Sequence, residues 1–216
     1  KVPPRLAADP KLIGEAADVL VDAEYPVLLT EYAARAPIGF GDTVELAEIT
    51  GAAVYDINKR LGFPNQHPLS VSMHADAFEG ADLVVALDVV DWTRGSHKPN
   101  WETREVEAIT TPDCKWIDIG FADIEISKWA TDYNKHHNWD LRILSDTANA
   151  IPALAAACRS RVKSDPKLEK RIEERKQLIG EKHAGQWAKW QEQVKDTWDQ
   201  TPMHEARMAT EVWEAI

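Results

Sequence analysis

Histidines and carboxylates are the residues of this sequence whose types and spacing could do chemistry. His67 and His74 lie in the stretch LGFPNQHPLSVSMHADAF, residues 61–78, which also contains two prolines. An imidazole titrates near neutral pH, so it can move protons, bind a metal or hold a turn. Carboxylates also lie at or near the ends of the stretches expected to be strands: Asp56, Asp88, Asp91, Asp118 and Asp146. At such positions carboxylates commonly cap helices and close turns, and we expect that role.

The stretch around His67 is typical of a rigid turn. Pro64 and Pro68 fix φ and remove amide donors, so the chain must follow an extended path there. His67 lies between them, where its imidazole can bond a neighbouring carbonyl and hold the turn. We therefore expect a structural role for His67. His136 and His137 lie in a polar stretch without a third ligand at metal spacing, so we assign them no metal.

Alternating strand and helix patterns position these side chains. Helices are expected after Asp9-Pro10, between Asp42 and Gly51, over residues 75–79, and after Asp146, where capping residues precede or follow the apolar period. Strands are predicted at 26–30, 53–57, 82–87, 115–119 and 141–144, and the first of them is a short continuous apolar run, as expected of a strand covered on both faces. The predicted fold class is α/β, a three-layer αβα Rossmann-like parallel sheet with an α-helical C-terminal extension.

The C-terminal part of the sequence has a different pattern. We predict a central α/β domain over 1–163, a charged linker helix over 164–200, and the start of another domain over 201–216. The linker helix carries an apolar stripe at helical spacing, which consists of Trp187, Trp190, Val194 and Trp198. So much aromatic surface needs a partner, either a further domain or another copy of the chain. Without one, we expect the tail to be mobile or to pair with itself.

Composition excludes several classes of protein. The 216 residues carry 25 basic and 36 acidic side chains, a formal net charge of −11, which argues against binding nucleic acid or an anionic membrane. No apolar run approaches the roughly 20 residues that span a bilayer. The two cysteines, Cys114 and Cys158, are too few for a disulfide framework, so we expect buried free thiols in a reducing cytoplasm.

The order of these signals resembles the central domain of thiamine diphosphate-dependent enzymes, in the group of acetolactate synthase and 2-oxo acid decarboxylases. The resemblance rests on FP-x-x-HPL in the crossover, on the strand DLVVAL, and on the closing D-x-x-x-AI-x-x-L. TPMHEARMATEVWEAI, at the C-terminus, likewise resembles the first helix of the diphosphate-binding domain that follows in those enzymes. The resemblance spans essentially the whole chain in the right order.

The resemblance implies that catalysis takes place outside this chain. In those enzymes a glutamate from the N-terminal domain activates the thiazolium, and a Gly-Asp-Gly motif with a downstream Asn in the C-terminal domain holds magnesium and diphosphate. This sequence has no Gly-Asp-Gly. We therefore expect no catalytic residue here, thiamine diphosphate and Mg²⁺ in the full-length enzyme only, flanking N- and C-terminal domains as partners, and a homo-oligomer.

The resemblance also implies a candidate nucleotide site, because some relatives bind FAD or ADP at the carboxyl ends of these strands. Met73-His74-Ala75 resembles the Met-His-Gly segment that approaches the flavin, with alanine in place of glycine. The candidate cofactor-binding residues are Arg35, His74, Arg94 and Lys98. Glu31, however, stands where relatives have a glycine-rich turn, and Leu87-Asp88 stands where they have Leu-Gly, and carboxylates would repel a pyrophosphate. FAD or ADP is therefore possible but disfavoured, and the alternative is a solvated loop at a subunit contact.

Overall fold

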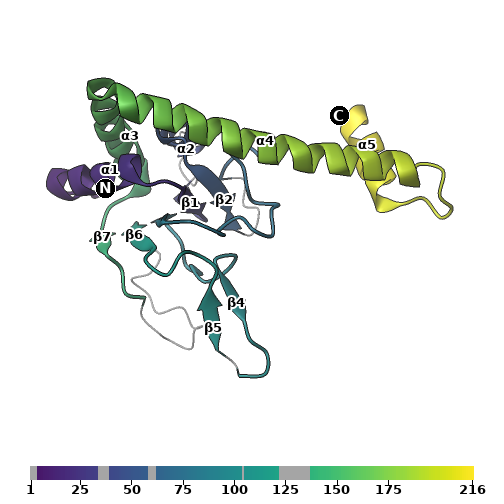
Figure 1. Ribbon diagram of the computed structural model, residues 1–216, viewed down its shortest axis with the longest axis horizontal. Coiled ribbons are helices and arrows are strands. Elements are labelled where there is room, and N and C mark those ends of the chain that lie inside the picture. Colours follow the sequence, from purple (N-terminus) through teal and green to yellow (C-terminus); the bar gives the residue numbers. More distant parts are fainter. Residues whose placement is uncertain (1–3, 34–38, 58–61, 104, 122–136) are drawn as a thin grey trace.

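A five-stranded parallel sheet forms the centre of the computed structural model, which describes residues 4–33, 39–57, 62–103, 105–121 and 137–216 (Figure 1). Its strands are β1 (Pro26–Thr30), β2 (Ala53–Asp56), β3 (Leu83–Leu87), β6 (Lys115–Ile119) and β7 (Leu141–Ile143). They pair in the order β2-β1-β3-β6-β7. The predicted α/β class and the five predicted strands are confirmed.

The two central strands, β1 and β3, are buried along their whole length. Burial on both faces explains why their sequences are apolar runs rather than alternating patterns. Val27 of β1 lies in register with Ala53 of β2 and Val84 of β3, and Val84 lies in register with Trp116 of β6. Residues in register point to the same face, as do residues two apart on one strand. Tyr55 and Trp116 therefore project from the same face of the sheet.

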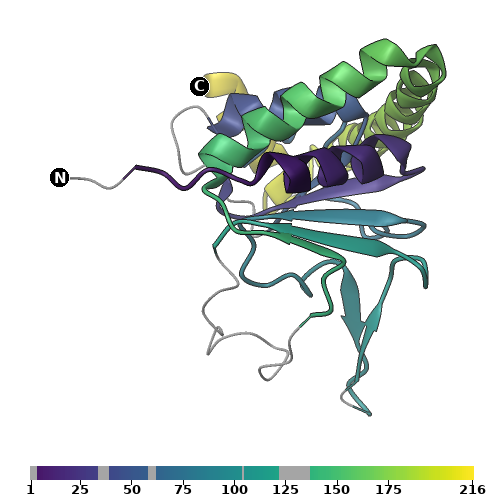
Figure 2. The same cartoon turned by 90° about the vertical axis from the view of Figure 1, so that its left-hand side faces the viewer.

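One face of the sheet is covered by helices. These are α1 (Pro10–Asp22), α2 (Gly39–Thr50) and α3 (Thr147–Ser164), which pack against one another on that face (Figure 2). The carboxylate of Asp9 accepts a hydrogen bond from the amide of Lys11 at 2.8 Å, and that of Asp146 accepts one from the amide of Ala148 at 2.9 Å. Such N-caps satisfy amides that have no partner within the helix, which confirms both predicted helix starts.

The other face carries turns and aromatic rings. Residues 75–80 form consecutive turns, with hydrogen bonds from the amide of Ala77 to the carbonyl of His74 and from the amide of Glu79 to the carbonyl of Asp76. The short helix predicted over 75–79 is therefore wrong. The aromatic cluster on this face consists of Trp92, His97, Trp116, His137 and Trp139, with centroids of contacting rings 4.0 to 6.2 Å apart.

A small antiparallel hairpin, which the sequence did not predict, extends from this face. It consists of β4 (His97–Pro99) and β5 (Val106–Ala108), and it projects below the sheet in Figure 1. The carbonyl of Ser96 accepts a hydrogen bond from the amide of Ile109 at 2.8 Å, which closes the base of the hairpin. The aromatic cluster thus joins the hairpin to β6, since it includes residues of both.

Two helices form the C-terminal tail. Helix α4 (Pro166–Thr197) crosses the helical layer and extends beyond the sheet, and α5 (Glu205–Ala215) folds back beside its far end (Figure 1). Arg171 and Arg175 both donate hydrogen bonds to the carbonyl of Val21 at the end of α1, at 2.9 and 3.0 Å. Cations stabilise a helix C-terminus because the carbonyls there carry partial negative charge. The first half of α4 is therefore fixed to the α/β domain.

The two cysteines are free thiols, as predicted, although Cys158 is buried and Cys114 only partly so. Burial raises the pKa of Cys158 to about 12 and that of Cys114 to about 11, so both remain protonated at neutral pH. None of the helices in the described part of the chain combines the length and the apolar character needed to cross a membrane.

Replacing Gly120 by alanine should destabilise the fold more than the same change at Gly80. Both glycines have positive φ, 146° and 83°, which L-residues rarely adopt. A Cβ at Gly120 would also lie 2.9 Å from the Cα of Asp88, whereas one at Gly80 would meet no atom within 4 Å. We expect Gly80→Ala to cost about 1–2 kcal/mol and Gly120→Ala about 2–4 kcal/mol. Urea unfolding of both variants tests this, and equal losses would contradict the close approach to Asp88.

Candidate functional site

The carboxyl ends of β1 and β3 form the first candidate site. In open parallel sheets, ligands bind outside the carboxyl ends of the strands, at the point where strand order reverses. After β1 the chain passes to β2 on one side of it, and β3 then lies on the other side. The reversal therefore lies between β1 and β3, and we call the residues that follow these two strands the switch point.

Glu31 closes the switch point with its own carboxylate. The residue follows β1 directly and is only 5% exposed. Its Oε2 accepts a hydrogen bond from the amide of Val90 at 2.8 Å and a longer one from the amide of Asp91 at 3.4 Å. The sequence predicted that Glu31 would repel a phosphate. The structure adds that its carboxylate occupies amide donors of the kind a phosphate would use.

The predicted cofactor-binding residues are not all brought together. Arg94 and Lys98 are exposed and lie in the segment after β3, with Lys98 on β4. His74 lies on the crossover, close to α4. Within the described residues, no hydrogen bond or ion pair joins His74 to either cation. Arg35 lies outside the described residues.

The carboxylates at the strand ends fill the predicted roles only in part: Asp146 caps a helix, whereas Asp88 and Asp118 bond to residues of neighbouring strand segments rather than to a turn or a helix end. Asp56 accepts a hydrogen bond from the amide of Gly62 at 2.9 Å, and Asp91 accepts one from the hydroxyl of Thr93 at 2.8 Å. Asp118 forms a 3.1 Å ion pair with Arg142. Asp88 accepts a hydrogen bond from the amide of Phe121 at 3.3 Å, and Asp146 is the N-cap of α3. Each of these contacts is structural.

His67 holds the turn of the crossover, as predicted, although its partner differs from the one expected. Its Nδ1 accepts a hydrogen bond from the amide of Leu69 at 3.2 Å, and its Nε2 lies 3.4 Å from a carboxylate oxygen of Glu48. The ring also contacts Phe63 edge-on, with centroids 4.9 Å apart. The imidazole therefore satisfies an amide rather than a carbonyl.

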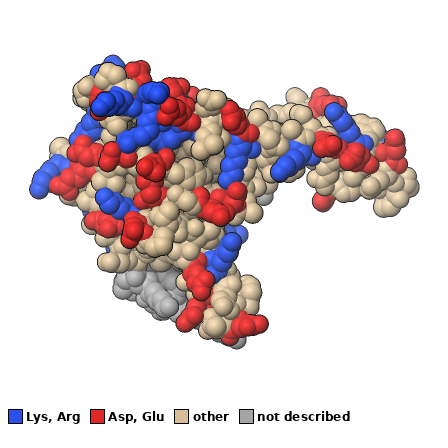
Figure 3. All heavy atoms as spheres, in the orientation of Figure 1, with Lys and Arg blue, Asp and Glu red and all other residues tan. Residues whose placement is uncertain are grey.

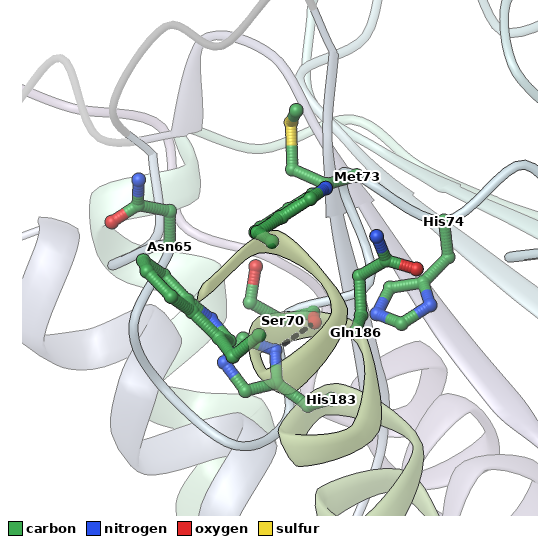
Figure 4. Close-up of a pocket in the computed structure, with 8 residues that line it drawn as sticks. Asn65, Ser70, Met73, His74, His183 and Gln186 are labelled. Atoms are coloured by element: carbon green, nitrogen blue, oxygen red, sulfur yellow. Dashed lines mark hydrogen bonds between the residues drawn. The ribbon is translucent and has the colours of Figure 1, made fainter. Parts of the chain in front are cut away.

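A pocket of about 100 Å³ between the crossover and α4 is the second candidate site (Figure 4). His183 of α4 donates a hydrogen bond from Nδ1 to the carbonyl of Ser70 at 2.9 Å, because a carbonyl can only accept. The ring of His74 lies 6.4 Å from that of His183 between centroids. The pocket is lined by Asn65, Ser70, Met73, His74, His183, Gln186, Trp187 and Trp190.

The chemistry of this pocket is limited. Burial, and then the charge of Lys182, lower the pKa of His74 from its ordinary value, so this imidazole is neutral at pH 7. No group of three or more His, Cys, Asp or Glu in the described ranges could hold a metal ion.

Trp187 and Trp190 pack edge to face, with centroids 5.4 Å apart. Sequence reasoning placed both on the apolar stripe of α4 but did not find their pairing with the crossover. The position of His183 one turn before Trp187 was the available signal.

His137 lies outside helices and strands, as predicted, but its surroundings are the rings of the aromatic cluster rather than polar. Its ring is 4.0 Å from that of Trp92 and 4.6 Å from those of Trp116 and Trp139, between centroids. Burial lowers its pKa to about 4, so the imidazole is neutral at physiological pH. His136 lies outside the described residues. His137 thus fills space between tryptophans and has no metal partner among the described residues.

Comparison with known proteins identifies similarity of fold. No protein-family model and no curated protein matches the sequence. The structure is similar to a protein from Mycobacterium smegmatis described as a thiamin diphosphate-dependent enzyme, with 18% sequence identity and a TM-score of 0.51. It is also similar to benzoylformate decarboxylase from Polynucleobacter necessarius, with 17% identity and a TM-score of 0.51. The alignments cover 73% of this chain but 29% and 28% of those chains.

Replacing His137 by phenylalanine should weaken the pH dependence of stability. The folded-state pKa of about 4 lies below the ordinary value of 6.5. As the pH falls through this window the unfolded state binds the proton first, and the free energy of unfolding decreases. Phenylalanine keeps the ring contacts and binds no proton. Urea unfolding at pH values near 7 and near 5 should show a smaller decrease for His137→Phe than for the parent, and an equal decrease would contradict this.

Removing the imidazole of His183 should destabilise the junction between the crossover and α4. His183→Ala leaves the Ser70 carbonyl without this donor, and we expect a loss of about 1–3 kcal/mol. Asparagine places an amide donor near the position of Nδ1, so His183→Asn should recover part of the loss. Denaturant unfolding of both variants measures the difference. If the two variants lose the same stability, the hydrogen bond is not what fixes α4 here.

Proposed function

We propose that this chain is the central domain of a thiamine diphosphate-dependent decarboxylase or carboligase that acts on 2-oxo acids, as in the acetolactate synthase group. The observation that carries the proposal is the sheet itself, which is similar to part of two chains, one a benzoylformate decarboxylase and the other described as thiamin diphosphate-dependent. The crossover FP-x-x-HPL, which carries the family resemblance, also supports it. In this crossover the amide of His67 bonds to the carbonyl of Pro64, and the imidazole of His67, just before Pro68, bonds to the amide of Leu69, so the motif forms one turn.

In this proposal the chain is a spacer and interface domain rather than a catalytic one. Thiamine diphosphate and Mg²⁺ bind to flanking N- and C-terminal domains, which the family resemblance implies. The described carboxylates at the strand ends are engaged in turns, caps and an ion pair. The switch point is filled by Glu31. These contacts support a scaffold role for the described part of the chain.

Helix α4 gives this scaffold its reach. At about 1.5 Å per residue, a helix of 32 residues is about 48 Å long. Arg171, Arg175 and His183 fix its first part to the α/β domain, so its far end projects from the body (Figure 3). In the full-length enzyme this helix would set the distance between the domain and whatever follows it.

Helix α5 supports the proposal of a neighbouring domain or subunit. None of its residues is buried, and Met208, Val212 and Trp213 are 55%, 55% and 69% exposed. Contacts with Trp198 fix its start, since the guanidinium of Arg207 lies 5.0 Å from the Trp198 ring and donates to the Trp198 carbonyl at 2.9 Å. Covering the exposed side chains would remove apolar surface from water. We infer a flanking domain or a second copy as the partner, in a cytoplasmic homo-oligomer.

The alternative function is a nucleotide-binding module for FAD or ADP. The observation in its favour is that two cations, Arg94 and Lys98, lie in the segment that follows β3, which is one of the two strands of the switch point. The carboxylate of Glu31 on the amides of Val90 and Asp91 opposes it. We therefore favour the scaffold, and the two functions are separated by the nucleotide content of the purified protein.

The complete reading frame that contains this chain tests the proposal. The full-length protein should release CO₂ from 2-oxo acids only when thiamine diphosphate and Mg²⁺ are added. The 216-residue chain alone should bind neither in calorimetric titration, because their ligands belong to other domains. It should also be colourless and release no adenine nucleotide when denatured. Saturable micromolar binding of thiamine diphosphate by the chain alone would overturn the assignment, and stoichiometric FAD or ADP would favour the alternative.

A further inference from the structure

We propose that Glu31 is an internal substitute for a ligand phosphate: its carboxylate fills an anion-binding site at the switch point and thereby decides that the site takes no phosphate ligand. The inference goes beyond the scaffold role, because it assigns a binding specificity to one residue whatever the rest of the enzyme does. The ligand class that the site would otherwise accept is a phosphate or diphosphate group.

The amides of Val90 and Asp91 are the donors of this anion site. Val90 and Asp91 follow β3 within a few residues, at the edge of the sheet where open α/β folds bind ligands. Their two amides are successive in the chain and converge on one atom, Oε2 of Glu31. Successive amides that point to one place form a concave anion site, of the kind that holds phosphates in many proteins.

The turn after β3 is held in place by contacts other than those of Glu31. Asp88 has φ 54°, a left-handed value that is uncommon for residues other than glycine. Its carbonyl accepts a hydrogen bond from the amide of Tyr32 at 3.2 Å, and its amide donates to the carbonyl of Ile119 at 2.8 Å. The turn is therefore held from both neighbouring strands, and its shape does not depend on Glu31 alone. The amides should remain in place when the carboxylate is removed.

The two donor amides lie close enough to the surface for a dissolved anion to reach them once Glu31 is removed. Glu31 is 5% exposed, but Val90 and Asp91 are only half-buried. Removing the Glu31 side chain would therefore leave a space that reaches solvent. A phosphate in that space would meet the same two donors, and Arg94, an exposed cation, lies three residues after Asp91 in the chain. The carboxylates of Asp88 and Asp91 oppose an anion, so we expect affinities in the millimolar range rather than tighter.

A dissolved phosphate must compete with the carboxylate of Glu31 for the two amides. A carboxylate that is part of the same chain does not have to be recruited from solution, so a dissolved anion must displace a group of high effective concentration. Hydrogen bonds to a carboxylate are also stronger than those to a neutral acceptor. Phosphate should therefore not bind measurably to the parent protein. With Glu31 removed, the same amides lack an acceptor and a dissolved anion can supply one.

The experiment compares the parent protein with Glu31→Ala and Glu31→Gln. Thermal unfolding is followed in sodium phosphate, in sodium pyrophosphate and in sodium chloride of matched ionic strength. Both variants should be less stable than the parent in chloride, and phosphate or pyrophosphate should restore part of the loss. Glu31→Ala should bind phosphate at least about tenfold more tightly than the parent, because a competing anion is gone. Glu31→Gln keeps the volume without the charge, so its gain should be smaller.

Two controls separate this role from a merely structural one. Phosphate stabilises many proteins nonspecifically, so His183→Ala, a destabilised variant far from the switch point in sequence, should gain no more than the parent. In nuclear magnetic resonance spectra of Glu31→Ala, the amide signals of Val90 and Asp91 should shift with phosphate and saturate. Destabilised Glu31 variants that gain no more from phosphate than His183→Ala, with unchanged amide signals, would show that Glu31 is only a tie between strands. Equal phosphate binding by the parent would also overturn the proposal.

Discussion

The central pair of strands is tied at both ends by carboxylates, and the remaining elements are arranged around that pair. At the amino ends, Asp82 accepts hydrogen bonds from the amides of Glu24 and Tyr25 at 2.7 and 2.8 Å, which joins the turn before β1 to the start of β3. At the carboxyl ends, Glu31 accepts from the amide of Val90 and joins the turn after β3 to the end of β1. Charge-assisted bonds of this kind are among the stronger ones in proteins, and here they hold both edges of a fully buried pair.

The two faces of the sheet serve different purposes. The helical face is a continuous apolar layer, which α4 extends by binding the carbonyl of Val21 through two arginines. The other face is built from large rings, including Trp116 and the neutral imidazole of His137. Rings of this size bury much area with few side chains. Because the rings bury so much area, turns and a short hairpin are enough to cover this second face of the sheet. The sequence had predicted helices there as well.

The sequence predicted the elements whose signals are local. The central strands β1 and β3 are short apolar runs, and Asp9 and Asp146 mark helix starts through bonds to amides two residues ahead. Helix α2 begins at Gly39 rather than at the predicted Asp42. The hairpin was missed because HKP and VEA have no apolar alternation, and its burial comes from rings elsewhere in the chain. The helix predicted over 75–79 failed because a propensity for helix lost to a series of turns.

The candidate sites could be predicted only in part, because their contacts join residues distant in sequence. The charge of Glu31 was visible, whereas its bond to Val90, 59 residues away, has no local pattern. The pairing of His183 with Ser70, 113 residues apart, is of the same kind. The length of α4 has one more consequence. Each residue inserted after His183 would advance the helix by about 1.5 Å and rotate everything beyond it by about 100°. Insertions or deletions in this half should therefore survive in evolution only near whole numbers of turns, such as seven residues, which change the rotational phase of α5 by only about 20°.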